Sequence, residues 1–411
     1  MSGPRKVLMH VGAPKTGTSY VQDVLFRHRQ ALAAGDILYP GDRFDAHFLA
    51  ALDLLELNWG GLEKEAVGAW DRLASEVRDW PGTVIISHEI LATATRPQVM
   101  RALTSLGEDV EVHVVLSARD LVRQIPAEWQ ENLKHRKVLS YRDFLDKVTD
   151  PQRKGPLASW FWGVQEVPDV LDRWGAALPP ERVHLVTVPR PGAPRDLLWL
   201  RFASVLGLDP STYTPVAERA NLSLGAPETA LIRHINERVN YGVLANEDYR
   251  RFVRELLVHN TLSQRSESPR LALPADVHAW AAELSESWIE LLGTRGYDVV
   301  GDLAELRPEP PEVGAGAGAY ADPDAPDEEA LNDAAMAAIV TLLQESALLA
   351  ASERSLGEAL HTAERELEHE RTRHWWYRFK RRLVHAADQN AVAALGLAAY
   401  RKVRGRSSRS A

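Results

Sequence analysis

The chain has 411 residues, of which 45% are hydrophobic and 26% are charged, and its formal net charge is −9. This composition is ordinary for a globular protein with a sizeable core. The negative charge argues against a general nucleic-acid binder, because neutralising phosphates requires a basic surface. The sequence contains no cysteine, which excludes disulfides, thiol catalysis and zinc–thiolate sites.

The apolar run near the N-terminus, Val7–Val11, is too short for a signal-peptide core or a membrane span. No other stretch approaches 18 uninterrupted apolar residues. We therefore expect a cytoplasmic protein, with peripheral attachment at the inner face of a membrane as a further option.

Four short apolar runs rich in β-branched residues predict buried strands: Lys6–Val11, Thr83–Ser87, Val112–Ser117 and Arg182–Val188. Helical patterns separate these runs, which predicts an α/β fold with a mostly parallel sheet flanked by helices. Ligands of such sheets bind beyond the carboxyl ends of the strands. We therefore expect the segments that follow three of these strands, Pro14–Ser19, His88-Glu89 and Arg119, to share one site.

Composition divides the chain into four parts. Residues 1–306 have the alternating pattern of the main domain, which becomes mainly helical after about residue 196. Residues 307–333 are rich in proline, glycine, alanine and acids, which predicts a disordered linker. Residues 334–390 predict an amphipathic helix or weak coiled coil, and residues 391–411 form a basic tail.

The loop Pro14-Lys15-Thr16-Gly17-Thr18-Ser19 carries the main functional signal. With Gly12 it has P-loop spacing, except that Thr18 stands where a nucleotide triphosphatase has lysine. A helix start after a glycine-rich turn favours an anion. Lys15 can reach the bridging oxygen between a phosphate and its terminal group and neutralise the charge that develops there. The alternative is a glycine-rich turn with a solvated lysine.

This loop resembles the 5′-phosphosulfate loop of the P-loop-like sulfotransferases of bacterial type. The resemblance implies a co-substrate, 3′-phosphoadenosine-5′-phosphosulfate, whose phosphosulfate is bound by Pro14–Ser19. It also implies in-line transfer of the sulfuryl group to a hydroxyl, with Lys15 as a catalytic residue and no metal. The acceptor class stays open between a carbohydrate, a lipid and a secondary metabolite.

A second motif, Val112–Asp120, is similar to the family's 3′-phosphate element, in which an arginine closes a strand. Arg119 fits this role, and its planar guanidinium suits bidentate phosphate binding. The family has a serine eight residues later, where this chain has Ala127. Arg123 either supplies compensating charge for the co-substrate or is a solvated helix residue.

The resemblance also implies a general base, a histidine or a carboxylate, close to the end of the second strand. His88 is the preferred candidate, because its unperturbed pKa of about 6.5 suits proton transfer at neutral pH. Glu89 and His47 are the alternatives, and His88 as a hydrogen-bonded core histidine competes with all of them.

Further residues have both a functional and a structural interpretation. Trp160, Phe161, Trp162 and Trp174 either line an acceptor pocket or belong to the core. The segment Glu128–Glu131 either faces the acceptor or places Trp129 in the core and its acids on the surface. A rival for the whole chain is a non-catalytic nucleotide-binding module with a decayed donor site, in which Ala127 is the defect and the C-terminal helix mediates assembly.

The C-terminal region combines an apolar stripe with a basic aromatic end. Leu342, Leu349 and Leu356 repeat every seven residues. Basic residues between 371 and 382 surround Trp375, Trp376, Tyr377 and Phe379, and a further basic run ends the chain. This pattern leaves two roles open: peripheral contact with an anionic membrane, or self-association through the helix.

Overall fold

A computed structural model describes residues 5–215, 224–239, 242–265, 268–310, 321–387 and 389–407. The chain divides into two compact units, Met1–Ala338 and Ile339–Ala411. The sheet and the residues singled out for the donor and the base all belong to the first unit.

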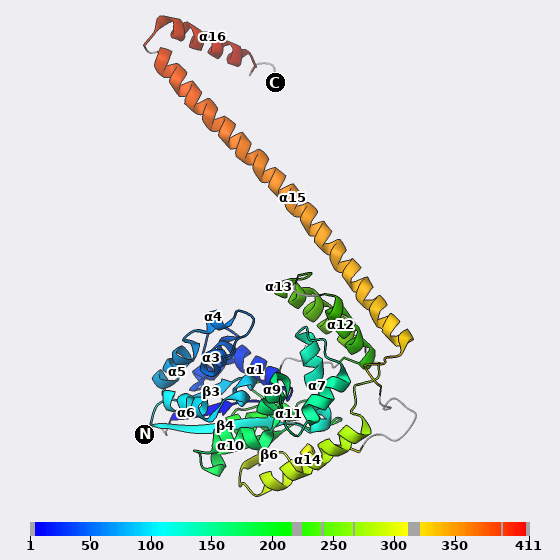
Figure 1. Cartoon of the computed structure of the whole chain (residues 1–411). Coiled ribbons are helices and arrows are strands. Elements are labelled where there is room, and N and C mark those ends of the chain that lie inside the picture. Colours follow the sequence, from blue (N-terminus) through cyan, green and yellow to red (C-terminus); the bar gives the residue numbers. More distant parts are fainter. Residues whose placement is uncertain are drawn as a thin grey trace. The chain divides into compact units, whose positions relative to one another are not determined.

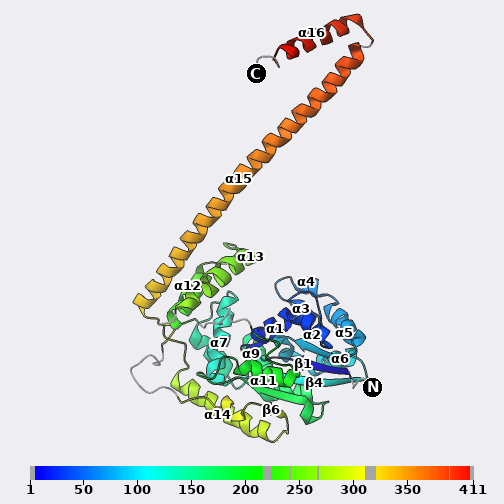
Figure 2. The ribbon, with the colours of Figure 1, turned by 180° about the vertical axis from the view of Figure 1, so that it is seen from behind.

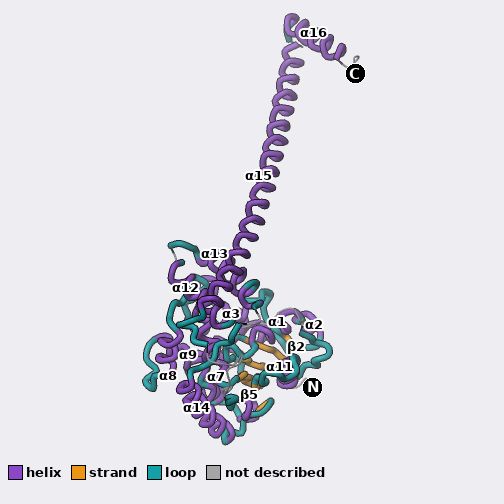
Figure 3. Tube along the Cα trace, turned by 90° about the vertical axis from the view of Figure 1, so that its right-hand side faces the viewer, coloured by secondary structure: helices purple, strands orange, loops and turns teal. Residues whose placement is uncertain are grey.

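A six-stranded parallel sheet forms the centre of the first unit, enclosed by helices (Figure 1; Figure 3). The strand order is β2-β3-β1-β4-β5-β6. The strands are β1 (Arg5–His10), β2 (Ile37–Leu38), β3 (Thr83–Ser87), β4 (Val110–Ala118), β5 (Val183–Thr187) and β6 (Asp298–Val300). The α/β class and the four predicted strands are confirmed. The edge strands β2 and β6 were not predicted, because two or three residues carry no periodicity.

Alternating residues of the strands pack against helices on both faces of the sheet. Leu8 and Val115 face one layer, whereas Met9 and Val114 face the other. The first layer consists of α1 (Thr18–Arg27), α2 (Arg29–Ala34) and α11 (Leu197–Leu206). The second layer includes α3 (Ala46–Leu55), α4 (Glu63–Ala66), α5 (Ala69–Asp79), α6 (Arg96–Ser105), α7 (Leu121–Lys134), α8 (Tyr141–Thr149), α9 (Pro156–Gln165), α10 (Val167–Gly175) and α14 (Ala275–Gly293).

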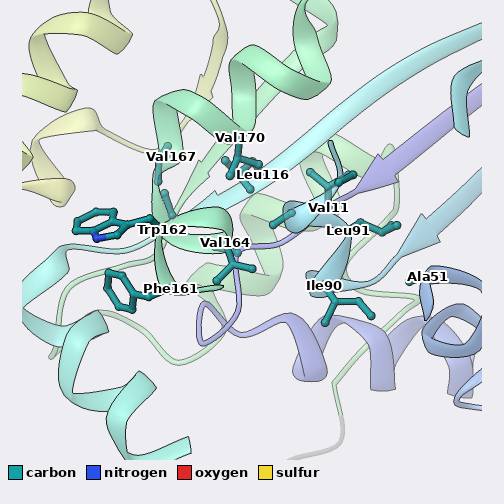
Figure 4. Packing of buried hydrophobic residues seen from close by; sticks show 14 of the residues in the cluster. Val11, Ala51, Ile90, Leu91, Leu116, Phe161, Trp162, Val164, Val167 and Val170 are labelled. Carbon is teal, nitrogen blue, oxygen red and sulfur yellow. The ribbon is translucent and has the colours of Figure 1, made fainter. Parts of the chain in front are cut away.

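Figure 4 shows this second layer from close by, where Leu116 of β4 lies near Val170 of α10 and Val164 of α9. These side chains are fully buried, and each contributes about 1.5–3 kcal/mol through burial. The segment that follows β3, η1 (Glu89–Thr93), adds Ile90 and Leu91 to the same core. The core therefore fixes the chain directly after β3, where a base was predicted.

Helix α7 leads away from the end of β4 and packs against α12 (Ala226–Arg238) and the π-helix η3 (Tyr249–His259). Figures 1 and 2 both show α7 beside α12. Pro126 lies inside α7, which is nevertheless continuous from Leu121 to Lys134. The remaining short elements are α13 (Asn246–Asp248), η2 (Pro180–Arg182), η4 (Leu262–Gln264) and η5 (Leu303–Leu306).

The described part of the predicted linker is fixed to the first unit. The carboxylate of Asp324 accepts hydrogen bonds from the backbone N–H groups of Tyr141 (2.9 Å) and Arg142 (2.8 Å). Helix α15 (Glu328–Ala387) begins inside the segment predicted as linker, and its residues Ala334 and Ala338 are buried. The first unit thus extends beyond the expected boundary at residue 306. Residues 311–320 of the predicted linker lie outside the described residues.

The second unit contains the rest of α15 and α16 (Ala391–Ser407). The helix expected over residues 334–390 is present, and much of the basic tail forms α16, whereas residues 408–411 lie outside the described part. Among the described residues, one helix, Glu328–Ala387, contains an 18-residue window of mean hydropathy 1.7 and by length and composition could cross a membrane.

Candidate active site

Three segments that were predicted to share a site lie at one edge of the sheet. Strands β3, β1 and β4 are parallel neighbours, so their carboxyl ends point the same way. The Pro14–Ser19 loop follows β1, His88-Glu89 follows β3, and Arg119 follows β4. The strand order therefore brings these three segments together.

The loop between β1 and α1 requires glycine at two positions. Gly12 (φ 124°) and Gly17 (φ 89°) both adopt a positive φ. A Cβ atom on Gly12 would lie 2.9 Å from the carbonyl oxygen of Glu89, and one on Gly17 would lie 2.5 Å from Leu198 Cδ2. The first contact means that the loop packs directly on the segment after β3. Gly17 is the N-cap of α1, and no side chain caps this helix end, so its backbone N–H groups suit an anion.

Thr16 is buried and supports the loop from within. Its hydroxyl oxygen lies 2.5 Å from the carbonyl oxygen of Ala13 and 2.5 Å from Ser117 Oγ. Close by, His10 Nδ1 lies 2.7 Å from Ser87 Oγ, and burial lowers the pKa of His10 to about 4. The Thr16 hydroxyl is therefore already hydrogen-bonded within the protein. A phosphosulfate would be bound by other groups of the loop, such as its backbone N–H groups.

Lys15 donates a hydrogen bond from Nζ to Glu131 Oε2 at 2.5 Å. Glu131 also lies 3.3 Å from His135 Nε2 and 3.7 Å from basic nitrogens of both Lys134 and Arg254. Burial raises the pKa of Glu131, but the His135 hydrogen bond, Lys15 and Lys134 outweigh it and hold that pKa well below its usual range. The loop cation thus shares one ionised carboxylate with three further basic side chains.

Gln124 of α7 joins the loop to Arg119. Its Nε2 donates to the Pro14 carbonyl oxygen at 2.5 Å and to Gln165 Oε1 at 2.9 Å, and its Oε1 accepts from Arg119 Nε at 2.8 Å. Burial, and then the neighbouring Arg123, lower the pKa of Arg119 to about 10, so the guanidinium stays charged at neutral pH. The two segments assigned to the donor by resemblance are therefore connected through one side chain, which sequence analysis missed.

Arg123 lies in the first turn of α7 and is not simply solvated. Asp120 caps the helix by accepting from the Arg123 backbone N–H at 2.9 Å and also forms an ion pair with its guanidinium. Arg123 Nη1 donates to the Pro189 carbonyl oxygen at 3.1 Å. Its Nη2 is buried without a hydrogen-bond partner among the described residues. Because this nitrogen has a hydrogen to donate, a role of Arg123 in binding a phosphate stays a prediction.

Within the segment Glu128–Glu131, Trp129 lies in the core, as one interpretation expected, but Glu128 is buried as well and does not lie on the surface. It is 4% exposed, and its Oε1 accepts from Gln165 Nε2 at 2.8 Å. Burial raises the pKa of Glu128 to about 7, with Lys15 opposing the shift and Glu131 adding to it. Gln124, Glu128 and Glu131 are spaced as i, i+4 and i+7, which places them on one face of α7. That spacing is the signal that could have identified them.

His88 and Glu89 both lie beside the loop. His88 Nδ1 accepts from the Ile90 backbone N–H at 3.3 Å, and its ring stacks on Phe48 with centroids 5.0 Å apart. Burial lowers the pKa of His88, with Glu89 opposing, so the ring is neutral at neutral pH. Glu89 accepts from Gln22 Nε2 at 2.9 Å; burial raises its pKa, but His88 and this bond outweigh burial and hold it low. The Glu89 carboxylate is able to take a proton directly, whereas a neutral His88 that accepts at Nδ1 carries its proton on Nε2 and can take another only by giving up the 3.3 Å contact with Ile90.

His47, the third candidate base, has both ring nitrogens engaged. Its Nδ1 accepts from the Ser87 backbone N–H at 3.0 Å, so Nε2 carries the proton that is donated to the Pro40 carbonyl oxygen at 2.8 Å. Burial lowers the pKa of His47 to about 4. With no free lone pair, His47 supports the end of β3 and is unsuited to accept a substrate proton.

The four aromatic residues considered for an acceptor pocket separate into two groups. Phe161, Trp162 and Trp174 are buried in the core, as Figure 4 shows for the first two. Trp160 is only partly buried, and its ring centroid lies 5.8 Å from that of Trp59. The core interpretation therefore holds for three of the four.

Trp160 belongs to a different set of rings, here called the aromatic row and defined as Phe48, Trp59 and Trp160. The Phe48 and Trp59 centroids are 5.7 Å apart. Phe48 contacts His88, and Trp59 lies 6.0 Å from the His135 ring. The aromatic row therefore connects a candidate base on one side with the Lys15–Glu131 cluster on the other.

Fold and site together define an α/β protein with charged side chains gathered at the carboxyl edge of a parallel sheet. Within the described residues, no group of three or more histidine, aspartate or glutamate side chains is arranged to hold a metal ion. No family model matches the chain, and no curated protein or solved structure matches it.

Proposed function

We propose that the first unit is a sulfotransferase with a P-loop-like fold that uses 3′-phosphoadenosine-5′-phosphosulfate. One observation carries this proposal: Gln124 joins the loop that contains Lys15 to Arg119. The co-substrate is anionic at its phosphosulfate and at its 3′-phosphate, so it needs a cationic group for each. Lys15 and Arg119 are suited to these two roles because both are partly buried and charged, at the sheet edge where ligands of such folds bind.

In the proposed reaction, the acceptor hydroxyl oxygen attacks the sulfur in line with the bond to the bridging oxygen. The S–O bond to the phosphate breaks, and the hydroxyl proton passes to His88 or Glu89. The products are a sulfate ester and 3′,5′-adenosine bisphosphate. Lys15 neutralises the charge that develops on the bridging oxygen, so it has to share or exchange its contact with Glu131 when the donor binds.

The test is mass-spectrometric detection of an added sulfonate after the protein and the donor are incubated with extracts and a panel of hydroxyl compounds. We expect transfer by the wild-type protein, with no requirement for a divalent metal. Lys15→Ala should lower turnover by on the order of 100-fold, since it removes a charge matched to the transition state. Lys137→Ala is the control, because Lys137 is an exposed lysine beyond the end of α7.

A second candidate is the non-catalytic nucleotide-binding module. It is favoured by Ala127, which replaces the expected serine, and by the Glu131 carboxylate, which occupies Lys15. Such a module would bind 3′,5′-adenosine bisphosphate and transfer no sulfonate to any member of the panel. Transfer that depends on Lys15 would rule it out.

A further inference from the structure

The cations around Glu131 outnumber the carboxylates that neutralise them. Lys15, Lys134 and Arg254 all lie within 4 Å of this one carboxylate. The contacts of Lys134 and Arg254 are loose, at 3.7 Å each, whereas Lys15 holds Glu131 at 2.5 Å. Glu128 compensates only in part, because burial raises its pKa to about 7 and so leaves it incompletely ionised at neutral pH. Partly buried excess charge is costly unless an anion completes the site.

Lys134 and His259 show the effect of this excess. The Lys134 side chain is only 14% exposed. Burial, and then Lys15 and Arg254, lower its pKa, with Glu131 opposing. Burial likewise lowers the pKa of His259, with Lys134 and Arg254 adding to the shift and Glu255 and Glu131 opposing it. A like-charge cluster of this kind is an electrostatic cost that a bound anion would remove.

The backbone at this place is also unusual. Arg254 and His259 both belong to η3, which is a π-helix over its whole length, Tyr249–His259. π-Helical backbone is rare, and where it occurs as single turns within α-helices it is frequently found at functional sites. This second observation is independent of charge, and it concerns the element that packs against α7.

The aromatic row gives this region an apolar wall. Trp59 contacts the His135 ring, and His135 binds Glu131 at 3.3 Å. At its other end the row contacts His88. A ring that stacks on the aromatic row would therefore lie between a candidate base and the basic cluster.

We propose that the sulfuryl acceptor is an anionic hydroxyl compound, whose phosphate, sulfate or carboxylate group is bound by Lys134 and Arg254. This inference rests on the proposed sulfotransferase function and names the substrate class for it. The negative group would neutralise the excess positive charge of the cluster, and the ring or apolar face of the same molecule would pack against the aromatic row. When the phosphosulfate binds Lys15, the single carboxylate of Glu131 remains to balance both Lys134 and Arg254, so one positive charge is left for the acceptor.

The test measures thermal unfolding with 3′,5′-adenosine bisphosphate at saturation, so that the donor site is filled first. Inorganic phosphate is then added and compared with chloride at equal ionic strength. We expect phosphate to raise the unfolding temperature further in the wild-type protein, since a ligand stabilises the state that it binds. The doubly substituted Lys134→Gln, Arg254→Gln protein should lose this increment. The matched control carries Lys137→Gln and Arg250→Gln, which change two exposed residues close in sequence to the first pair.

A second arm compares 4-hydroxybenzyl alcohol, 4-hydroxybenzoate and 4-hydroxyphenyl phosphate, which separates the two sources of negative charge. We expect one of the anions to bind the same complex at least roughly tenfold more tightly than the alcohol. The difference should disappear in the Lys134→Gln, Arg254→Gln protein. That variant should also unfold at an unchanged or higher temperature without ligand, because like-charge repulsion is relieved; a purely structural pair would lose stability instead.

The proposal is overturned if phosphate gives no increment in the wild-type protein, or if the increment survives in the variant. Equal binding of the alcohol and both anions would also overturn it. In each of these cases the protein would still bind 3′,5′-adenosine bisphosphate, so the proposed function would stand. Failure of the wild-type protein to bind 3′,5′-adenosine bisphosphate at all would instead overturn the proposed function, and with it this inference, so the two failures are distinguishable.

Discussion

Lys15 Nζ lies 2.5 Å from Glu131 Oε2, so the loop cation is paired with a carboxylate of α7. In the proposed complex the phosphosulfate competes with this carboxylate for the same ammonium group. Glu131 therefore acts both as a counter-ion for the empty site and as a like charge that opposes the donor.

Replacing this counter-ion should separate its two effects. We expect Glu131→Gln to tighten binding of 3′,5′-adenosine bisphosphate roughly five- to tenfold, because a like charge is removed from the site. The same change should lower stability, since Lys15, Lys134 and Arg254 lose their shared carboxylate. Calorimetric titration and thermal unfolding measure the two effects. Glu255→Gln is the control, as an exposed acid on η3; equal effects of both changes would refute the specific role of Glu131.

Glu128 should make stability depend on pH. Burial raises its pKa in the folded state to about 7, whereas the pKa of an unfolded glutamate carboxyl is about 4.3. Ionisation of Glu128 therefore lowers the free energy of unfolding. The loss is absent below about pH 4.3 and complete above about pH 7. Lys15, Glu131 and Arg119 are the charged groups that act on it.

We expect Glu128→Gln to raise the free energy of unfolding by up to roughly 3 kcal/mol at pH 8 and to change it little at pH 4.5. The amide oxygen of the new side chain still accepts from Gln165 Nε2. Urea unfolding at both pH values measures the difference. A gain of the same size at both would show that the effect is packing rather than ionisation.

The end of the first unit should lie near Ala338 rather than Arg307. A chain that ends after Arg307 loses the Asp324 bonds to Tyr141 and Arg142 and the buried Ala334. We expect it to be less stable than a chain that ends after Ala338 by about 2 kcal/mol or more, the scale of hydrogen bonds to a charged group. Equal stability of the two shortened chains, measured by urea unfolding, would place the boundary where the sequence predicted it.

The second unit offers a test between a membrane and a second copy. Trp375, Trp376, Tyr377 and Phe379 are all at least 41% exposed, and the Trp375 and Phe379 rings stack at 5.3 Å. Aromatic rings among basic residues suit an anionic lipid surface. We expect the full chain to co-sediment with anionic but not neutral vesicles and to be released by salt, because exposed charges are screened. Indifference to anionic vesicles at low salt, together with a dimer in solution, would favour self-association.

The sequence predicted the α/β class, the four central strands and the edge at which the site lies, because β-branched runs and a glycine-rich turn leave local signals. It also located the Pro14–Ser19 loop, His88-Glu89 and Arg119 at that edge. These features depend on residues close together in the chain, where periodicity and turn chemistry apply.

The contacts that organise the site could not be predicted in the same way. Gln124 meets Pro14 across 110 residues, and Lys15 meets Glu131 across 116. Burial of Glu128 depends on the packing of α7, which overrides the preference of a charged residue for the surface. The fixed position of Asp324 depends on two backbone N–H groups at the start of α8, which composition does not reveal.

The most direct test of the account is calorimetric titration of the wild-type and Arg119→Ala proteins with 3′,5′-adenosine bisphosphate and with adenosine 5′-monophosphate, which lacks the 3′-phosphate. We expect the wild-type protein to prefer the bisphosphate, and Arg119→Ala to weaken the bisphosphate alone by about 1.5–3 kcal/mol, the range for a charged hydrogen bond. Equal affinity of the wild-type protein for both nucleotides, or an equal loss for both in the variant, would contradict the assignment of this edge of the sheet to a 3′-phosphorylated sulfuryl donor.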